Sequence, residues 1–267
     1  MSLEDNELYY EIVGDGEPIV MLHGFTGTRH TWGSLKTFLS DYQLILFDLP
    51  GHGCSKGYSL TSMKACCKQL RKQLNKMNIM KFHLVGYSMG GRTAIHFANE
   101  FPDMVQSLIL ESASPGLSSE LEQSQRQQND KNLANYILQN GIEEFVNYWQ
   151  DIPLFLSQKE LSEEKQQQIR NERLSHQPEG LVHSLHSMGT GAQPSFWNDL
   201  EQMIMRVLLV VGEKDSKFVK INNKMREKLP NAELTVCKNV GHAVHVENPQ
   251  IFGKIVEEFL NRNPIAT

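Results

Sequence analysis

A serine flanked by glycines stands in the segment GYSMG at residues 86–90. The apolar run FHLVG leads into this segment, and the helical sequence GRTAIHFANE follows it. A strand-to-helix turn of this kind leaves room only for glycine-sized neighbours, and it lifts the serine hydroxyl to the positive end of the helix. Ser88 is therefore a candidate nucleophile or base.

A serine hydroxyl is weakly reactive unless a base takes its proton and a carboxylate orients that base. Asp215 follows one strand-like run, and His242 follows the next one along the chain. Because parallel strands end at the same edge of a sheet, we expect both side chains to meet Ser88 there. Glu213 is the alternative acid, although it stands closer to the strand. The spacing predicts a catalytic triad of Ser88, Asp215 and His242.

Two backbone N–H groups are candidates for stabilising an oxygen that gains negative charge. Phe25 follows the apolar run PIVML and the pair His23-Gly24, and Met89 directly follows the serine. Their N–H groups are expected to form an oxyanion hole, where loss of one donor typically raises the barrier by ~2.7–4 kcal/mol. For His23 we expect a structural hydrogen bond, and for His245 a packing or surface position.

An arginine stands one helical turn after the serine. Ser88 and Arg92 are four residues apart on one predicted helix, so they lie on nearly the same face. An internal salt bridge and an anionic ligand are the two interpretations that the spacing leaves open. Arg126 and Arg173, in the polar middle of the chain, are further candidates for binding carboxylates. Glu122, four residues before Arg126, offers a surface helix pair as the alternative.

The elements that must position these residues follow from the hydrophobic pattern. Short apolar runs separated by amphipathic helices predict an α/β fold, with a mostly parallel central sheet flanked by helices. We expect strands at residues 18–22, 43–48, 82–86, 107–111, 207–212 and 233–237. We expect helices at residues 61–77, 91–100, 217–228 and 249–262. Ligands of such folds bind beyond the carboxyl ends of the strands, which is where the candidate triad falls.

One segment interrupts the alternation of strands and helices. Residues 117–199 contain polar helical sequence such as ELEQSQRQQNDKNLANYILQ and no strand-like run, and this stretch is too long for a loop. We predict a helical cap at residues 117–199, inserted into a core of residues 1–116 and 200–267. The cap carries six Lys and Arg against twelve Asp and Glu. Individual arginines, and not a general positive field, must therefore bind any anion.

The composition limits the class of protein. The chain has 267 residues and a formal net charge of -5, which gives no reason to expect nucleic acid as a partner. No apolar run approaches the ~20 residues that span a bilayer, so we expect no stable membrane insertion. The four cysteines show no zinc-like spacing, and MSLEDNELYY has no signal-peptide pattern. We expect a cytoplasmic protein without a metal site, and the sequence leaves open a monomer or a weak dimer.

Five motifs follow one another in the order typical of α/β-hydrolase-fold enzymes: HGFTG, DLPGHGCS, GYSMGGR, GEKD and GHAVHVENP. The chain resembles that superfamily over its whole length. In addition, GYSMGGR, the cap sequence RQQND and the run SMGTGAQPS resemble the synthases that make 2-succinyl-6-hydroxy-2,4-cyclohexadiene-1-carboxylate (SHCHC) in menaquinone biosynthesis. The resemblance covers core and cap together, which makes it more specific than the serine motif alone.

The resemblance to the synthases implies a substrate, a reaction and binding residues. The family's substrate is a small molecule with three carboxylates, and the reaction removes a proton next to its succinyl ketone and expels pyruvate without a cofactor. Arg170 is an alternative to Arg173, because the match there depends on spacing back from GAQPS. The resemblance implies substrate-binding roles for Tyr87, Arg92, Arg126, Trp149 and Arg173.

Two other functions use the same constellation. A serine hydrolase of esters, thioesters or C–C bonds needs the same triad, and Arg92 is the feature that a site for neutral esters does not need. A non-catalytic receptor would bind a small ligand beneath the cap, but the complete triad disfavours this function. Haloalkane dehalogenases and epoxide hydrolases are disfavoured because they place Asp where this chain has Ser88.

Overall fold

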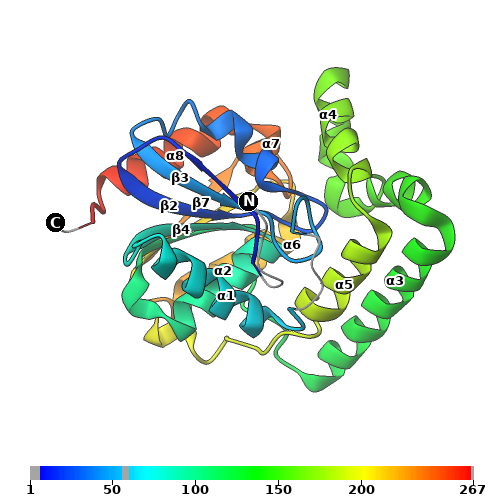
Figure 1. Cartoon of the computed structure of the whole chain (residues 1–267), viewed down its shortest axis with the longest axis horizontal. Coiled ribbons are helices and arrows are strands. Elements are labelled where there is room, and N and C mark those ends of the chain that lie inside the picture. The colour runs from blue at the N-terminus through cyan, green and yellow to red at the C-terminus, as the bar shows by residue number, and fades with distance from the viewer. Residues whose placement is uncertain (1–6, 56–59, 266–267) are drawn as a thin grey trace.

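The computed structural model describes residues 7–55 and 60–265 of the chain. Within these residues lies a seven-stranded sheet with the order β1-β3-β2-β4-β5-β6-β7 (Figure 1). β1 pairs with β3 in antiparallel fashion, and the other neighbours are parallel. The strands are β1 (Tyr10–Val13), β2 (Glu17–Leu22), β3 (Tyr42–Phe47), β4 (Phe82–Tyr87), β5 (Val105–Glu111), β6 (Arg206–Gly212) and β7 (Ala232–Cys237).

The sheet confirms the six strands predicted from the sequence, with boundaries that move by one or two residues. β1 is the strand that the hydrophobic pattern missed. It lies at the edge of the sheet, and its four residues YEIV are half-buried or exposed. A short edge strand lacks the continuous apolar run that identifies a strand buried on both faces, so periodicity alone does not reveal it.

Helices cover both faces of the sheet (Figure 1). Side chains alternate along each strand, so that Val20 and Leu22 of β2 enter one core while Ile19 and Met21 enter the other. No described helix combines the length and apolar composition needed to cross a bilayer. The first core is covered by α1 (Met63–Lys76), α2 (Met89–Glu100) and α6 (Ser216–Lys228), and the second by η1 (Arg29–Leu35), α7 (Val244–Glu247) and α8 (Pro249–Asn261).

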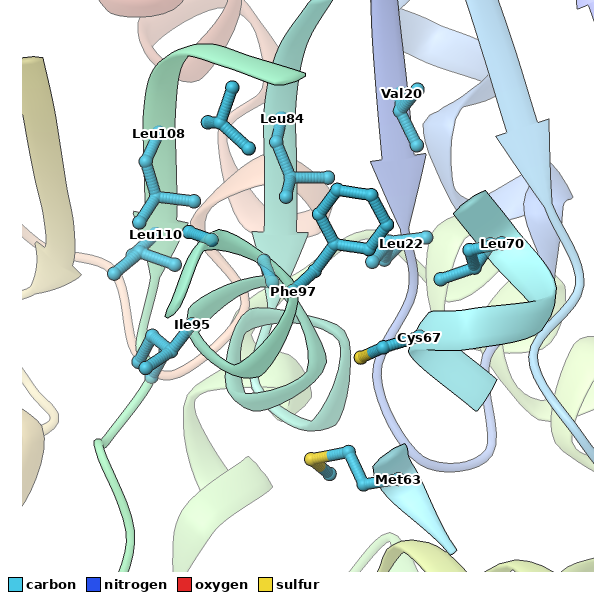
Figure 2. Close-up of a cluster of buried hydrophobic side chains, with 14 of the residues drawn as sticks. Val20, Leu22, Met63, Cys67, Leu70, Leu84, Ile95, Phe97, Leu108 and Leu110 are labelled. Carbon is cyan, nitrogen blue, oxygen red and sulfur yellow. The ribbon is translucent and has the colours of Figure 1, made fainter. Parts of the chain in front are cut away.

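Figure 2 shows the first core, where Leu84 of β4 and Phe97 of α2 lie between the sheet and α1. Cys67 points from α1 into the same layer. Cys66 and Cys67 are fully buried free thiols, and burial raises the pKa of Cys66 to about 12. These cysteines therefore act as small apolar packing groups.

The chain between β5 and β6 is helical, as the polar helical pattern predicts. Ser119 and Glu122 form a capping box at the start of α3, and Gly141, with φ of 79°, interrupts this long helix. These helices lie to one side of the sheet (Figure 1) and have a small apolar core of their own. The division of the chain into core and cap at residues 117 and 199 remains a prediction. The helices are α3 (Glu120–Trp149), η3 (Pro153–Glu160), α4 (Glu163–Leu174) and α5 (Pro178–Met188).

Candidate active site

Ser88 stands in a sharp turn between β4 and α2. Its backbone has φ of 50° and ψ of -107°, a conformation that a residue with a side chain rarely adopts. The Ser88 N–H donates to the Glu111 carbonyl at 2.9 Å, which fixes the turn against β5. A β-carbon built on Gly86 would lie 2.5 Å from the Gly90 carbonyl oxygen, so the turn requires glycine there. The turn predicted from GYSMG is present.

The side chains of Ser88, His242 and Asp215 form one hydrogen-bonded chain. His242 Nε2 lies 3.0 Å from Ser88 Oγ, and His242 Nδ1 lies 2.6 Å from Asp215 Oδ2. The other carboxylate oxygen of Asp215 accepts the Phe218 N–H at 3.2 Å, where Asp215 caps α6. With the Nδ1 proton held by the carboxylate, Nε2 is free to accept the serine proton. The geometry brings together the three residues predicted to act as a triad.

The alternative acid and the second histidine lie elsewhere. Glu213 is exposed and accepts the Asn239 N–H at 3.1 Å, so it does not orient His242. His245 is buried, and its Nδ1 lies 2.9 Å from Glu111 Oε1. Its Nε2 lies 2.8 Å from Thr31 Oγ1. His245 therefore has the packing position expected from the sequence.

The loop at residues 23–28, here called the oxyanion loop, passes directly beside the serine. A β-carbon built on Gly24 would lie 3.5 Å from Ser88 Cβ, so the loop passes beside the serine one residue before Phe25. Met89 begins α2, where a helix has N–H groups without an acceptor of its own. His23 accepts the Leu49 N–H at 2.9 Å and donates from Nδ1 to the Gly24 carbonyl at 2.8 Å. This is the structural bond expected for His23.

A cavity of about 790 Å³ opens above the serine. Its wall combines apolar rings and cationic side chains from core and cap. Asp215 lies behind His242, and Arg173 lines a separate cavity of about 590 Å³ together with Arg170. The predicted site residues that line the first cavity, here called the main cavity, are Phe25, Tyr87, Ser88, Met89, Arg92, Arg126, Trp149 and His242.

Arg92 is buried at the junction of core and cap. Its Nη1 donates to the Met188 carbonyl at 2.8 Å and to Gln193 Oε1 at 2.5 Å. Among the described residues it forms no ion pair with a carboxylate, so the internal salt bridge is the weaker of the two interpretations. Burial, and secondly the charge of Arg126, lower the pKa of Arg92 to about 9. The side chain remains a cation at neutral pH, and a bound anion would stabilise it.

Arg126 and Arg173 are placed differently from each other. Arg126 pairs through Nε with Asp130 Oδ1 at 2.8 Å, one turn away on α3, and not with Glu122, the partner in the alternative interpretation. Arg173 donates from Nη2 to Gln158 Oε1 at 2.9 Å, and burial lowers its pKa to about 10. Arg126 therefore reaches the main cavity as half of a helix pair, while Arg173 is a buried cation.

Phe155 stands beside Arg173 where the two cavities meet. Its ring lines both cavities, and the Arg173 guanidinium carbon lies 4.7 Å from the ring centroid. The structure thus brings Arg92 and Arg126 to the main cavity, while Arg173 lines the second cavity against the Phe155 ring. Arg170, the alternative to Arg173, lies 3.9 Å from the Glu143 carboxylate in an ion pair.

Several residues of this site were not predicted from the sequence. Phe218 packs against the His242 ring at 4.7 Å between centroids. Trp149 itself was predicted, but not that its buried indole N–H, next to the main cavity, has no hydrogen-bond partner among the described residues. One face of α6 also lines the cavity, and its helical spacing was the signal available in the sequence. The residues on that face are Lys217, Ile221, Lys224 and Lys228.

Residues 17–249 match the family described as alpha/beta hydrolase fold. The chain belongs to this family, as its parallel sheet and serine turn already indicated. Within the family it is similar to the SHCHC synthases. It is 42% identical over 261 residues, 94% of each chain, to a Bacillus subtilis (strain 168) protein provisionally named 2-succinyl-6-hydroxy-2,4-cyclohexadiene-1-carboxylate synthase. The resemblance inferred from the motifs is thereby confirmed.

Solved structures show the same similarity in three dimensions. MenH from S. aureus matches with a TM-score of 0.91 at 35% identity, over 95% of this chain and 98% of that chain. An esterase from Thermogutta terrifontis, solved with malate bound, matches with a TM-score of 0.86 at 26% identity, over 96% and 93% of the two chains. Because MenH and an esterase share this fold, the chemistry must be argued from the site.

Proposed function

We propose that this protein is a carbon–oxygen lyase that eliminates pyruvate from 2-succinyl-5-enolpyruvyl-6-hydroxy-3-cyclohexene-1-carboxylate and forms SHCHC. The observation that carries the proposal is Arg92, a buried cation in the main cavity whose hydrogen-bond partners are uncharged. A substrate carboxylate would supply the missing negative charge. The similarity to SHCHC synthases supports the same substrate class. We expect the reaction to need no cofactor and to take place in the cytoplasm.

In this proposal Ser88 acts as a base and is not acylated. His242 Nε2, 3.0 Å from the hydroxyl, accepts the Ser88 proton while the oxygen removes the proton next to the succinyl ketone. The electron pair moves through the ring double bond, and the bond from the ring to the enolpyruvyl oxygen breaks. Imidazolium returns a proton to the departing enolpyruvate, which becomes pyruvate. Asp215 stabilises the imidazolium that forms transiently.

The oxyanion hole would act on the enolate. Removal of the α proton places negative charge on the ketone oxygen, and the Phe25 and Met89 N–H groups would donate to that oxygen. An esterase uses the same electrostatics for a tetrahedral intermediate. The position of Gly24 against Ser88 Cβ supports this arrangement.

The cavity supplies binding groups for an anionic, ring-shaped substrate. Arg92 and Arg126 reach it directly, and both would bind carboxylates. The unpaired Trp149 N–H would donate to a substrate oxygen, and Tyr87 forms part of the wall beside the serine. Arg173 would take part only after the Phe155 ring moves aside.

A serine hydrolase acting on a carboxylate-bearing molecule is the second candidate. The hydrogen-bonded triad serves acyl transfer as well as elimination, and the similar esterase was solved with a dicarboxylate bound. The two candidates differ in the fate of Ser88, which is acylated only in the hydrolase. A receptor function is disfavoured, because a binding protein gains nothing from the strained backbone of Ser88.

The test offers the purified protein the enolpyruvyl substrate and, separately, a panel of p-nitrophenyl esters. Fast pyruvate release with feeble ester cleavage supports the lyase, and the opposite result supports the hydrolase. Intact-mass measurement during turnover provides a second criterion. A covalent adduct on Ser88 with the native substrate would contradict the role of Ser88 as base.

A further inference from the structure

The cap and the oxyanion loop are joined by a carboxylate. Glu172 lies on α4, and its Oε1 accepts the Thr28 N–H at 2.9 Å and the Thr28 hydroxyl at 2.6 Å. Thr28 is the last residue of the loop that carries Phe25, and it also caps η1. Two donors from one loop residue thus converge on a single oxygen of a cap residue. Hydrogen bonds to an ionised carboxylate are among the stronger ones in proteins.

A second cap residue holds the middle of the same loop. His176, which follows α4, lies with Nε2 3.0 Å from the Thr26 carbonyl. On the other side, the Thr26 N–H donates to His52 Nε2 at 3.3 Å. Thr26, directly after Phe25, is thus bonded to the cap through its carbonyl and to the core through its N–H.

The backbone of the oxyanion loop needs such external bonds. Thr26 has φ of 65°, a left-handed conformation that is unfavourable for a β-branched residue. A residue in this conformation persists only where neighbouring groups determine it. The Phe25 N–H lies one peptide before the Phe25–Thr26 peptide, so a change in the backbone at Thr26 would displace Phe25 beside Ser88.

The polar contacts of Glu172 are made mainly with the oxyanion loop. Burial raises its pKa, and the two hydrogen bonds from Thr28 act in the opposite direction. Among the described residues it forms no ion pair with Lys or Arg, so its contacts with the loop are its principal polar contacts. Its exposed neighbour Glu164 lies on the same helix without such a contact to the core.

We propose that Glu172 is a positioning residue that holds the Phe25 N–H in the oxyanion hole from the cap, so that the rate of the chemical step depends on the docking of α4. The inference rests on the proposed function for the identity of the oxyanion, but any reaction at Ser88 that develops negative charge would share the dependence. Glu172 does not touch the substrate in this proposal and acts through Thr28 and Thr26.

The first test compares Glu172→Ala, Glu172→Gln and the matched control Glu164→Ala. Loss of a properly placed oxyanion donor lowers kcat by about 10²–10³, so a displaced donor should lower it at least about tenfold. We expect this loss in kcat for Glu172→Ala, with KM within about twofold of wild type. Glu172→Gln keeps an acceptor oxygen and should recover much of the activity, while Glu164→Ala should equal wild type.

A second pair of variants approaches the same bond from the loop. Thr28→Val removes the hydroxyl donor, and Thr28→Ser retains it. We expect kcat to fall in the valine variant and to recover in the serine variant. This pair decides the question even if Glu172→Ala does not fold, because both variants retain the carboxylate in the cap.

A covalent probe separates this inference from the proposed function. A fluorophosphonate reacts when Ser88 Oγ bonds to phosphorus and fluoride leaves, and this step also uses the oxyanion hole. If the wild-type protein releases no pyruvate, the proposed function fails. The rate of Ser88 phosphonylation then still measures the effect of Glu172 on the oxyanion hole. Two results with folded Glu172→Ala would overturn the positioning role. One is that neither kcat nor the phosphonylation rate changes. The other is that KM rises while kcat stays at the wild-type value.

Discussion

The Arg92 guanidinium lies 2.5 Å from the side-chain oxygen of Gln193, an uncharged partner more than one hundred residues away in the chain. The bond fixes the direction of the cation without neutralising it. Burial lowers the pKa of Arg92 to about 9, because the charged form of the side chain loses hydration inside the protein. A buried cation held in this way is poised for an anionic ligand.

The first prediction concerns Arg92 itself. Arg92→Ala should lower kcat/KM for the enolpyruvyl substrate about 10- to 150-fold, because a hydrogen bond to a charged group contributes about 1.5–3 kcal/mol. The free energy of unfolding should change by no more than about 1–2 kcal/mol, because removal of an unneutralised buried charge offsets the loss of two hydrogen bonds. Coupled pyruvate release and chemical denaturation measure the two effects. The exposed Arg226→Ala serves as control, and full activity of Arg92→Ala would refute an anionic subsite here.

Substitution of Ser88 or Asp215, which are both hydrogen-bonded to His242, should sharply lower kcat. Ser88→Ala and Asp215→Asn should each lower kcat by about 10⁴, the loss typical when a triad member or its tautomer is removed. Glu213→Gln is the matched control, because that carboxylate binds the Asn239 N–H and not His242. Steady-state rates with the native substrate measure these effects. A Glu213 variant as impaired as the Asp215 variant would show that the acid is misassigned.

The unpaired N–H of Trp149 should be used by the substrate. Trp149→Phe removes this donor while keeping an aromatic ring in the cavity wall, and we expect kcat/KM to fall about tenfold. Stability should not decrease, since no hydrogen bond is lost in the free protein. Trp197→Phe is the contrasting variant, because the Trp197 N–H donates to the Gly116 carbonyl at 3.0 Å. That variant should lose about 1 kcal/mol of unfolding free energy; equal effects of the two would contradict the assignment.

Lysines on one face of α6 should accelerate capture of an anionic substrate. Lys217 and Lys224 line the main cavity, so kcat/KM should fall as ionic strength rises. The double variant Lys217→Gln/Lys224→Gln should have a lower kcat/KM at low salt and a shallower salt dependence. Lys220→Gln, an exposed change on the same helix, should keep the wild-type slope. Identical slopes in all three proteins would exclude steering by this face.

Acid should destabilise the protein through the buried histidines. Burial lowers the pKa of His176 to about 4 from an ordinary value of 6.5, so the unfolded chain binds a proton that the folded chain does not. The free energy of unfolding should therefore fall as pH decreases from about 6.5 to 4, by about 3 kcal/mol from this group. His176→Gln should flatten the pH dependence by about that amount, whereas the exposed His186→Gln should not. Denaturation midpoints measured across this range provide the test.

Local sequence patterns predicted that Ser88, Asp215 and His242 meet, because strands and glycines set their positions. Short apolar runs define six of the seven strands, and parallel strands deliver Ser88, Asp215 and His242 to one sheet edge. The glycines of GYSMG permit a turn that other residues would block. These features depend on neighbours along the chain, so the sequence by itself determined them.

Contacts between distant segments were decided only by the tertiary structure. The packing of the Phe155 ring against Arg173 and the bond from Glu172 to Thr28 could not be predicted from spacing. Such pairs depend on how the cap helices sit over the sheet, and many partners of suitable charge compete for each arginine. Hydrophobic periodicity and glycine fix the path of the backbone, whereas the partner of a long polar side chain depends on which distant segments the fold brings within its reach.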